Sequence, residues 1–564
     1  MYILGISCFY HDSSASLIHD GKVIAAAQEE RFNRIKASSD FPIQAINFCL
    51  QKAQITIKDL DYIVFYEKPY LKFERVIKDH LKHYPFSLPN FLNLIPYWLQ
   101  DRLSLQMKIE EELSFEGKIL YTPHHYSHAA SAFFCSPFKE AAIITADAVG
   151  EFDTTTIGVG KNNKIKLIKT LSYPHSLGLL YTTISTYLGF KANTGEGKVM
   201  GLAALGQPKY LDVFKKLVNV KDDGSFQLNE KYFSFNSGSK MFTKNLEKLL
   251  GPARKMGKTH EKNIEQKYLD IASTLQTMIE EIILKIAKHT YKETGLKKLC
   301  LAGGVFLNCV ANTRILKETP FKEVFIQPAA GDAGGSLGAA LSVYYHFLNK
   351  PRSSFVMEDA FLGPSFSEKE IVQVLRKNDA NYKKLSDSQL KKFVTQKLNK
   401  NKIIGWFQGE MEFGPRALGH RTILANACNK NMKDLLNQKI KHREWFRPYG
   451  IIIPENEVAN YFQENINNQF MLMIGNIKKT KTKLIPSAIH YDGTSRLQTI
   501  TKKTHGLLYE IVTEFKKLSG VPILINTSFN DNNEPIVCTP QNAYDCFIKT
   551  EMDFLVMGNY LIKK

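Results

Sequence analysis

The sequence predicts an α/β protein of two domains, of which the first is built from a duplicated unit. The chain has 564 residues, which is more than one hydrophobic core normally serves, so two domains are expected. Apolar runs of strand length alternate with amphipathic segments of helical spacing, a pattern typical of α/β folds. In addition, one arrangement of strands and turns occurs twice in the first half of the chain.

The duplicated unit consists of one strand, a short loop and two further strands joined by a turn. The first copy is YILGISCF followed by SASLIHDGKVIAAAQEERF, in which Asp20-Gly21 predicts the turn. The second copy is AAIITADAVG followed by TTTIGVGKNNKIKLI. Two copies of one plan predict two related halves that enclose a cleft.

A stretch with three histidines, HHYSHAA, indicates a metal site. On a helix, His124 and His128 lie four positions apart on one face, so both imidazoles can reach one ion, whereas His125 points elsewhere. Asp147 closes the strand TADAVG and Asp332 opens the loop GDAGGS; strand ends facing one cleft are where α/β proteins place ligands. Two imidazoles and two carboxylates suit iron, manganese or zinc better than calcium or magnesium. The alternatives are a surface helix with polar histidines and two ordinary turn aspartates.

Three glycine loops, TGEGKVMGLAALG, AGGVFLN and GDAGGSLG, indicate a nucleotide. Glycine lets main-chain N–H groups approach phosphate closely, and Lys198 adds positive charge. None of the loops has the spacing of a P-loop, and close packing of a helix on a strand is the alternative for each. Three loops in one domain favour ATP, and the residues expected to contact it are Lys198, Gly303, Gly304, Asn308, Gly331 and Gly334.

A long helix and a change of composition mark the end of the first domain. Apolar residues recur at helical spacing from Lys262 to His289, which predicts an amphipathic helix leading to the buried strand KKLCLAG. After Lys350, PRSS is followed by a stretch rich in lysine and aspartate. We therefore expect domains of residues 1–355 and 356–564.

The second domain is rich in arginine beside glycine and proline, in FGPRALGHRTILAN, KHREWFRPYG and HYDGTSRLQT. Guanidinium groups match the geometry of phosphate and carbonyl oxygens, although a surface salt bridge is the alternative for any one of them. The segment VPILINTSFNDNNEPIV predicts a buried strand whose amides and hydroxyls either bind a small urea-like group or cap a turn. The candidate substrate-binding residues are Arg416, Arg421, Arg443, Arg447, Arg496, Asn526, Thr527, Ser528 and Asn530.

Composition limits the class of protein and its partners. The eight cysteines include no CxxC pair, which favours reduced thiols in a cytoplasmic protein. The first residues lack a signal-peptide pattern, and no apolar run approaches the roughly 20 residues of a membrane helix, so we expect a soluble protein without a membrane partner. A net charge of +19 leaves nucleic acid open, but no zinc finger or RNA-recognition motif supports it. Small anionic substrates explain clustered arginines equally well.

A set of motifs runs in order from about residue 3 to residue 560: HDSSASLIHDG, EERFNRIK, HHYSHAASAF, TADAVGEFDTT, GKVMGLAALG, GGVFLNCVAN, GDAGGSLGAA, EFGPRALGHR, KHREWFRPYG, HYDGTSRLQT and LINTSFNDNNEPIV. Together they resemble the nodulation-protein and antibiotic-tailoring O-carbamoyltransferases. The resemblance implies a first domain of the actin-like ATPase fold, like the tRNA threonylcarbamoyl-transfer proteins. It implies a second domain like the threonylcarbamoyl-adenylate synthases.

The resemblance also implies a reaction. The second domain is expected to join carbamoyl phosphate and ATP, with magnesium, into carbamoyl adenylate. The first is expected to move the carbamoyl group to a hydroxyl of a sugar, antibiotic or other natural product. The first domain is expected to use a divalent metal bound by His124, His128, Asp147 and Asp332. Iron is the metal expected first, and manganese or zinc are the alternatives. Lys439 is expected to help the arginines, and His11 or Asp12 is the candidate proton acceptor, although a structural strand-end histidine is the alternative. A homodimer is a further expectation.

Two other functions stay open at this point. A tRNA threonylcarbamoyl-transfer enzyme shares the metal motif and has use for the net charge, but NTSFN and FRPYG are motifs of the small-molecule enzymes. A non-enzymatic actin-like nucleotide-binding scaffold predicts that alanine at Arg447 or Asn526 leaves function intact.

Overall fold

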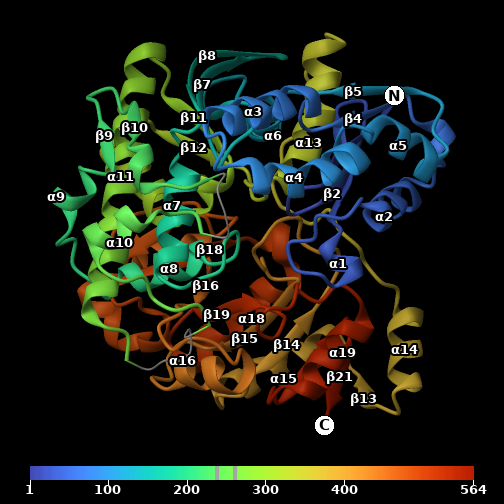
Figure 1. Ribbon diagram of the computed structural model, residues 1–564. Coiled ribbons are helices and arrows are strands. Elements are labelled where there is room, and N and C mark those ends of the chain that lie inside the picture. Colours follow the sequence, from blue (N-terminus) through green and yellow to red (C-terminus); the bar gives the residue numbers. More distant parts are fainter. Residues whose placement is uncertain (236–239, 258–262) are drawn as a thin grey trace. The chain divides into compact units, whose positions relative to one another are not determined.

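The computed structural model describes residues 1–235, 240–257 and 263–564, and the chain divides into two compact units (Figure 1). Unit 1 contains Met1–Glu29 and Ala37–Met357, and unit 2 contains Glu30–Lys36 and Glu358–Lys564. The short helix α1 (Glu30–Asn33) is therefore part of unit 2, although its neighbours in the sequence belong to unit 1. No single border along the chain describes this division.

Unit 1 contains two five-stranded sheets that share one topology. In each, three antiparallel strands are extended by two strands parallel to the first. The first sheet has the order β3-β2-β1-β4-β5, with β1 (Tyr2–Ser7), β2 (Ser14–His19), β3 (Lys22–Gln28), β4 (Tyr62–Phe65) and β5 (Lys118–Tyr121). The second has the order β12-β11-β6-β7-β8, with β6 (Glu140–Ala146), β7 (Asp153–Lys161), β8 (Lys164–Ser172), β11 (Lys298–Ala302) and β12 (Glu323–Ile326). The predicted duplication is confirmed.

Helices α6 (His124–Phe133) and α13 (Ala333–Ser342) pack against each other. Helix α13 also packs against the first sheet, and α6 packs against the second. Their close approach depends on glycine, because a Cβ on Gly338 would lie 1.8 Å from the carbonyl oxygen of Ser127 in α6. The segment GDAGGSLG, predicted to be a loop, is therefore mostly the first turns of a packed helix. The small residues there are needed for helix contact.

The other helices of unit 1 include the predicted long amphipathic one. This is α11 (Gln266–Thr294), which buries one face, while the predicted start at Lys262 lies outside the described residues. In residues 1–235, 240–257 and 263–564, no helix is both long and apolar enough to cross a membrane. The remaining elements are α2 (Ile43–Ala53), α3 (Pro69–Lys82), α4 (Leu88–Tyr97), α5 (Leu105–Leu113), α7 (Leu177–Tyr187), α8 (Glu196–Ala203), α9 (Leu211–Phe214), β9 (Val218–Val220), β10 (Phe226–Leu228), α10 (Lys244–Leu250) and α12 (Cys309–Glu318).

Unit 2 is built on a nine-stranded mixed sheet of order β13-β21-β20-β14-β15-β19-β16-β18-β17. Successive residues of the central strands enter two different cores: Ile451 joins one and Ile452 the other, so both faces of the sheet are buried. Its strands are β13 (Asn381–Lys384), β14 (Ile404–Phe407), β15 (Arg421–Asn426), β16 (Gly450–Pro454), β17 (Ile474–Asn476), β18 (Thr494–Ile500), β19 (Leu524–Ser528), β20 (Phe554–Met557) and β21 (Tyr560–Lys563). Its helices, besides α1, are α14 (Glu368–Lys377), α15 (Asp387–Asn399), α16 (Met432–Leu435), α17 (Val458–Tyr461), α18 (Lys502–Ser519) and α19 (Pro540–Lys549). The strand predicted from VPILIN is confirmed as β19.

Candidate functional site

The four predicted metal ligands converge in unit 1. One ligand atom from each of His124, His128, Asp147 and Asp332 lies within 4.8 Å of the others. The two Nε2 atoms are 3.1 Å apart, and Asp147 Oδ2 lies 2.9 Å from that of His128 and 3.4 Å from that of His124. Asp332 Oδ1 lies 3.6 and 3.8 Å from the same two nitrogens. All four residues are buried, and together they are called the four-ligand cluster.

Local structure explains how these side chains meet. Helix α6 places His124 and His128 one turn apart on the same face. Asp147 directly follows the last residue of β6, and Asp332 directly precedes α13. Because α6 packs on both β6 and α13, three separate segments deliver their ligands to one point.

The charges of the cluster suit a divalent cation. Burial lowers the pKa of His124, but contacts with Asp147 and Glu67 outweigh burial and raise it to about 10. Burial raises the pKa of Asp147, yet the two histidines hold it well below its usual range. Protons on both facing Nε2 atoms would repel each other, whereas one cation would satisfy both nitrogens and both carboxylates. The donor set therefore fits a metal ion of the kind that accepts mixed nitrogen and oxygen ligands.

His125 lies outside the cluster. Its Nδ1 is 2.6 Å from Thr145 Oγ1, in the core of the second sheet. Burial and then the neighbouring His124 and His128 lower the pKa of His125 well below its ordinary value. It is a neutral core histidine.

Two buried carboxylates support His124 and were missed from the sequence. Glu67 Oε2 lies 3.6 Å from His124 Nδ1 and 2.5 Å from Lys72 Nζ. Burial raises the pKa of Glu67, but Lys72 and His124 outweigh it and lower the pKa to about 2. Glu151 accepts the main-chain N–H of His124 at 3.0 Å. The available signal was that Glu67 follows the end of the strand YIVF, much as Asp147 follows β6.

The loop after β1 lies beside the four-ligand cluster. His11 Nε2 is 3.8 Å from Asp332 Oδ2, and His11 Nδ1 is 2.9 Å from Asp12 Oδ2. The pair Gly303-Gly304 follows β11, and a Cβ on the second glycine would lie 3.0 Å from a carboxylate oxygen of the cluster. The structure thus brings the predicted catalytic pair and two of the predicted nucleotide-binding glycines to the same place.

The other nucleotide candidates are more dispersed. Asn308 donates from Nδ2 to Gln276 at 3.0 Å and caps α12 with its Oδ1, so both ends of its amide serve packing. Gly334 lies within α13, where a Cβ would meet a carbonyl oxygen at 2.2 Å. Lys198 is on α8, and a Cβ on Gly331 would meet no atom within 4 Å.

A cavity of about 470 Å³ is lined in part by the residues that precede His11. Its wall combines aromatic rings with charged groups: Phe9, Tyr10, Phe41, Tyr97, Trp98, Asp40, Asp101, Arg102 and Lys108. The Arg102 guanidinium donates to the carbonyl of Phe9 at 2.5 Å, and Lys108 pairs with Asp101 at 2.6 Å. Its volume and its mixture of apolar faces and fixed polar groups are those of a small-molecule pocket.

In unit 2, the strand register aligns two candidate residues. Arg496 on β18 and Asn526 on β19 both pair with Gly450 on β16, so they lie in one row across the sheet. Asn526 Nδ2 donates to the carbonyl of Ala417 at 3.1 Å and to a glutamine of β18 at 2.7 Å. Because Ala417 follows Arg416, this hydrogen bond ties the row to the loop FGPRALGH.

A buried glutamate, also missed from the sequence, shapes the loop that carries Arg416. Glu412 Oε1 accepts three main-chain N–H groups at 2.8, 2.9 and 3.1 Å, those of Leu418, His420 and Arg421. Three donors on one carboxylate oxygen fold the loop around that side chain. The motif therefore presents Arg416 on a fixed main chain.

Three of the predicted arginines concentrate positive charge. Desolvation and then the neighbouring Arg443 and Arg496 lower the pKa of Arg447 to about 10, against the opposing effect of a glutamate. Like charges gathered in this way favour an anionic ligand. Arg421 differs, because it is fully buried and donates to two main-chain carbonyls at 2.9 and 3.1 Å, so its guanidinium supports the fold.

A lysine missed from the sequence holds the loop after β19. Lys441 Nζ donates to the carbonyls of Ser528 and Asn530 at 2.5 and 2.8 Å, and to Asn530 Oδ1 at 2.6 Å. Burial holds the pKa of Lys441 well below its usual value. Lys439, the lysine expected to help the arginines, is 48% exposed and pairs with Glu551 at 2.6 Å. The structure therefore brings Lys441, and not Lys439, to this loop.

Comparison with known families shows the class of enzyme. A model described as "Carbamoyltransferase N-terminus" matches residues 2–341, and one described as "Carbamoyltransferase C-terminus" matches residues 395–564. The chain therefore belongs to the carbamoyltransferase family, and it is an enzyme of carbamoyl transfer.

Relatives of this family extend along the whole chain. Nodulation protein NolNO of Sinorhizobium fredii is 34% identical over 574 residues, covering 99% of this chain and 79% of that protein. Nodulation protein NolO of Bradyrhizobium diazoefficiens is 33% identical over 446 residues, covering 78% of each. An uncharacterised protein of Synechocystis is 42% identical over 597 residues, covering 100% of this chain and 97% of the relative.

Solved structures resemble part of the chain only distantly. HypF of T. kodakarensis is 12% identical with a TM-score of 0.33 and covers 63% of this chain and 48% of that one. A ROK hexokinase of Thermus thermophilus is 11% identical with a TM-score of 0.27 and covers 61% and 98%. The predicted actin-like fold of the first domain is confirmed by its own duplicated sheets.

Proposed function

We propose that the protein is an ATP-dependent O-carbamoyltransferase that uses carbamoyl phosphate and carbamoylates a hydroxyl of a small molecule. The main support for the proposal is that one carbamoyltransferase chain contains two separate sets of functional side chains, one in each unit. Unit 1 has a buried cluster of cation ligands. Unit 2 has three neighbouring arginines, Arg443, Arg447 and Arg496, called the arginine cluster, and a loop of amides and hydroxyls held by Lys441. A two-step reaction with an activated intermediate makes use of both.

Unit 2 is proposed to make carbamoyl adenylate. Carbamoyl phosphate, ATP and one water give carbamoyl adenylate, pyrophosphate and phosphate. Arg416, Arg443, Arg447 and Arg496 would hold the anionic groups, since preorganised guanidinium groups stabilise charge that develops on phosphate oxygens. Lys441 would fix the loop of Ser528 and Asn530, which the sequence predicts to bind the carbamoyl group.

Unit 1 is proposed to transfer the carbamoyl group, so that the acceptor hydroxyl and carbamoyl adenylate give the carbamate ester and AMP. A divalent ion held by the four-ligand cluster would supply Lewis acidity at the reacting centre. His11 or Asp12, next to the cluster, would take the proton of the hydroxyl. The cavity beside Phe9 and Tyr10 would hold the acceptor, because its aromatic faces and fixed charges suit a hydroxylated ring compound.

The proposal is tested by incubating the full chain with ATP, magnesium, carbamoyl phosphate and Fe²⁺, Mn²⁺ or Zn²⁺ in separate reactions. Pyrophosphate and a product with the mass of carbamoyl adenylate are expected. A folded, metal-loaded protein that forms neither would contradict the proposal. The reaction is expected without tRNA, and activity that appears only with tRNA would favour the alternative kept open above.

Replacing Glu67 by glutamine is expected to weaken metal binding without unfolding the protein. Glutamine keeps the shape of the side chain but removes the negative charge 3.6 Å from His124 Nδ1. Loss of a partner that orients a ligand histidine costs about 10- to 100-fold in metal affinity. Titration with Co²⁺, followed by visible absorption, measures this. Glu74→Gln, which removes an exposed pair with Lys78, is the control and should bind Co²⁺ like the unsubstituted protein.

A further inference from the structure

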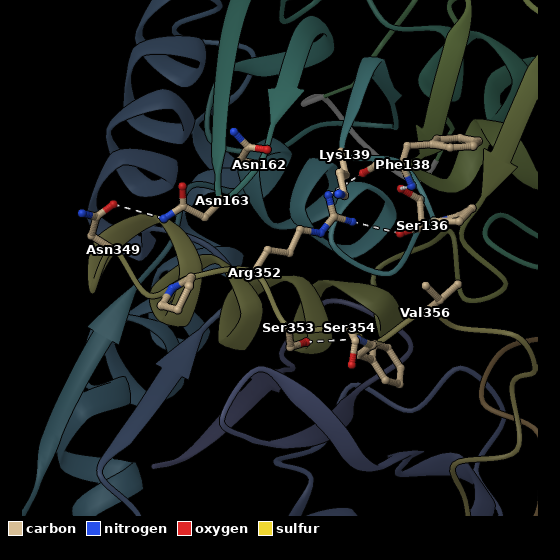
Figure 2. Close-up of a pocket in the computed structure, with 13 residues that line it drawn as sticks. Ser136, Phe138, Lys139, Asn162, Asn163, Asn349, Arg352, Ser353, Ser354 and Val356 are labelled. Carbon is tan, nitrogen blue, oxygen red and sulfur yellow. Dashed lines mark hydrogen bonds between the residues drawn. The ribbon is translucent and has the colours of Figure 1, made fainter.

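Arg352 lies on the segment through which the chain leaves unit 1, and it binds the end of the helix that carries both cluster histidines. Its Nη2 donates to the carbonyl oxygens of Phe133 and Ser136 at 2.7 and 2.9 Å, and its Nη1 donates to that of Phe138 at 2.5 Å. Figure 2 shows the side chain reaching to the Ser136 and Phe138 segment. The guanidinium carbon also lies 4.5 Å from the centre of the Phe133 ring.

These contacts have a clear physical reason. Helix α6 ends at Phe133, where its last carbonyl groups have no partner within the helix. A cation at this end satisfies them and complements the helix dipole. A guanidinium donates to several carbonyls in one fixed plane and stacks flat on an aromatic ring, whereas an ammonium group is a compact point charge with no plane to stack.

Arg352 binds the connection between α6 and β6, and residues of the four-ligand cluster lie on both sides of this connection. The residues between α6 and β6 are Phe134 to Lys139; α6 carries His124 and His128, and β6 leads into Asp147. A second bond fixes the same connection, since the main-chain N–H of Met357 donates to the carbonyl of Cys135 at 2.9 Å. Three of the four cluster residues thus lie on, or directly after, the two elements whose connection Arg352 binds.

We propose that Arg352 is a positioning residue for the four-ligand cluster, which holds α6 and β6 at the spacing that metal binding requires. Metal ligands must lie within a few tenths of an ångström of their ideal positions, so a small shift of α6 weakens the site. This inference rests on the proposed metal site. It concerns a residue that touches none of the four ligands.

Removing the guanidinium is expected to leave the protein folded, because Arg352 borders an open cavity. Arg352 lines a cavity of about 730 Å³ together with exposed residues such as Lys139, Asn162 and Asn349 (Figure 2). A shorter side chain enlarges this existing space instead of opening a void in a closed core. Variants at this position are therefore suitable for measurement.

The test compares Arg352→Met and Arg352→Lys with Lys139→Met, a control on the wall of the same cavity. The metal-free full chain is titrated with Co²⁺ and followed by visible absorption, while circular dichroism reports folding and pyrophosphate release reports the chemistry of unit 2. Both Arg352 variants are expected to lose about 10- to 100-fold in Co²⁺ affinity, as when a ligand-orienting partner is lost, and to show altered Co²⁺ absorption bands. The control is expected to match the unsubstituted protein, and pyrophosphate release is expected to be unchanged in all of them.

The outcomes separate this inference from the function on which it rests. If the unsubstituted protein binds Co²⁺ and the Arg352 variants have the same affinity and spectrum, with only a lower melting temperature, Arg352 is merely structural and the inference is overturned. If Arg352→Lys keeps the Co²⁺ affinity and spectrum of the unsubstituted protein while Arg352→Met loses them, a positive charge is sufficient for metal binding. The proposed role of the guanidinium geometry is then overturned. If the unsubstituted protein binds no Co²⁺, the proposed metal site is wrong and the inference is overturned with it.

Discussion

Pyrophosphate release from ATP and carbamoyl phosphate is expected to fall about 100- to 1000-fold when Arg447 is replaced by alanine, the range seen when one preorganised charge-stabilising donor is lost. The Arg447 side chain is 25% exposed, and the neighbouring Arg443 and Arg496 contribute to the lowering of its pKa. A charge held in this environment acts on a polyanionic substrate far more strongly than one in water. Initial rates with both substrates in excess measure the effect.

Lys439→Ala is the matched control for this prediction. Its ammonium pairs with Glu551 on the surface, so the rate is expected to stay within about twofold, as for most exposed ion pairs. A large loss in Lys439→Ala would restore that lysine to the donor site predicted from the sequence. Unchanged pyrophosphate release in a folded Arg447→Ala would instead remove the arginine cluster from the reaction and favour the scaffold alternative.

The second large effect is expected at His128. Its Nε2 lies 2.9 Å from Asp147 and 3.1 Å from the Nε2 of His124, so it occupies the centre of the cluster. Replacing it by alanine is expected to lower Co²⁺ affinity by more than about 100-fold, beyond the loss for a supporting group. Carbamoylation of the acceptor should then fail, whereas pyrophosphate release should continue because the arginine cluster belongs to the other unit.

His125→Asn provides the control for that substitution. His125 bonds to Thr145 and lies outside the cluster, so Co²⁺ binding should persist even if the melting temperature falls. Equal loss of metal in both variants would show that the helix as a whole, and not His128 as a ligand, sets the affinity. Equal loss of pyrophosphate release and of transfer in His128→Ala would show that the two steps are not divided between the units as proposed.

The elements of the fold were largely predictable, because their signals are local. The duplicated strands of unit 1, the helix α11 and the buried strand β19 each follow from the spacing of apolar residues within a few turns or strand lengths. The pairing of His124 with His128 follows from the pitch of one helix. Asp147 at the end of a strand and Asp332 at the start of a glycine-rich segment were visible as well, so the sequence predicted the set of candidate ligands.

Other features depend on segments that are distant in the chain. Glu67 supports His124 from the end of another strand, and Glu412 folds a loop around three N–H groups. Glu412 opens the motif EFGPRALGHR, yet nothing local showed that its carboxylate would accept those N–H groups. GDAGGSLG has the composition of a phosphate loop, but its last glycine, Gly338, lies within a helix, where contact with α6 leaves no room for a Cβ. The excursion of Glu30–Lys36 into unit 2 likewise has no local signal.

Lys439 and Lys441 show what the sequence alone could not predict. Lys439 and Lys441 are two positions apart and equal in charge, and only burial against Ser528 and Asn530 distinguishes the second from the first. Arg352 similarly resembles any polar residue of a connecting segment until its three carbonyl partners are seen. Spacing along the chain specifies which elements form and which side chains share a face. Which of two similar charges is desolvated and held depends on packing between remote segments, because burial is a property of the folded chain and not of its local sequence.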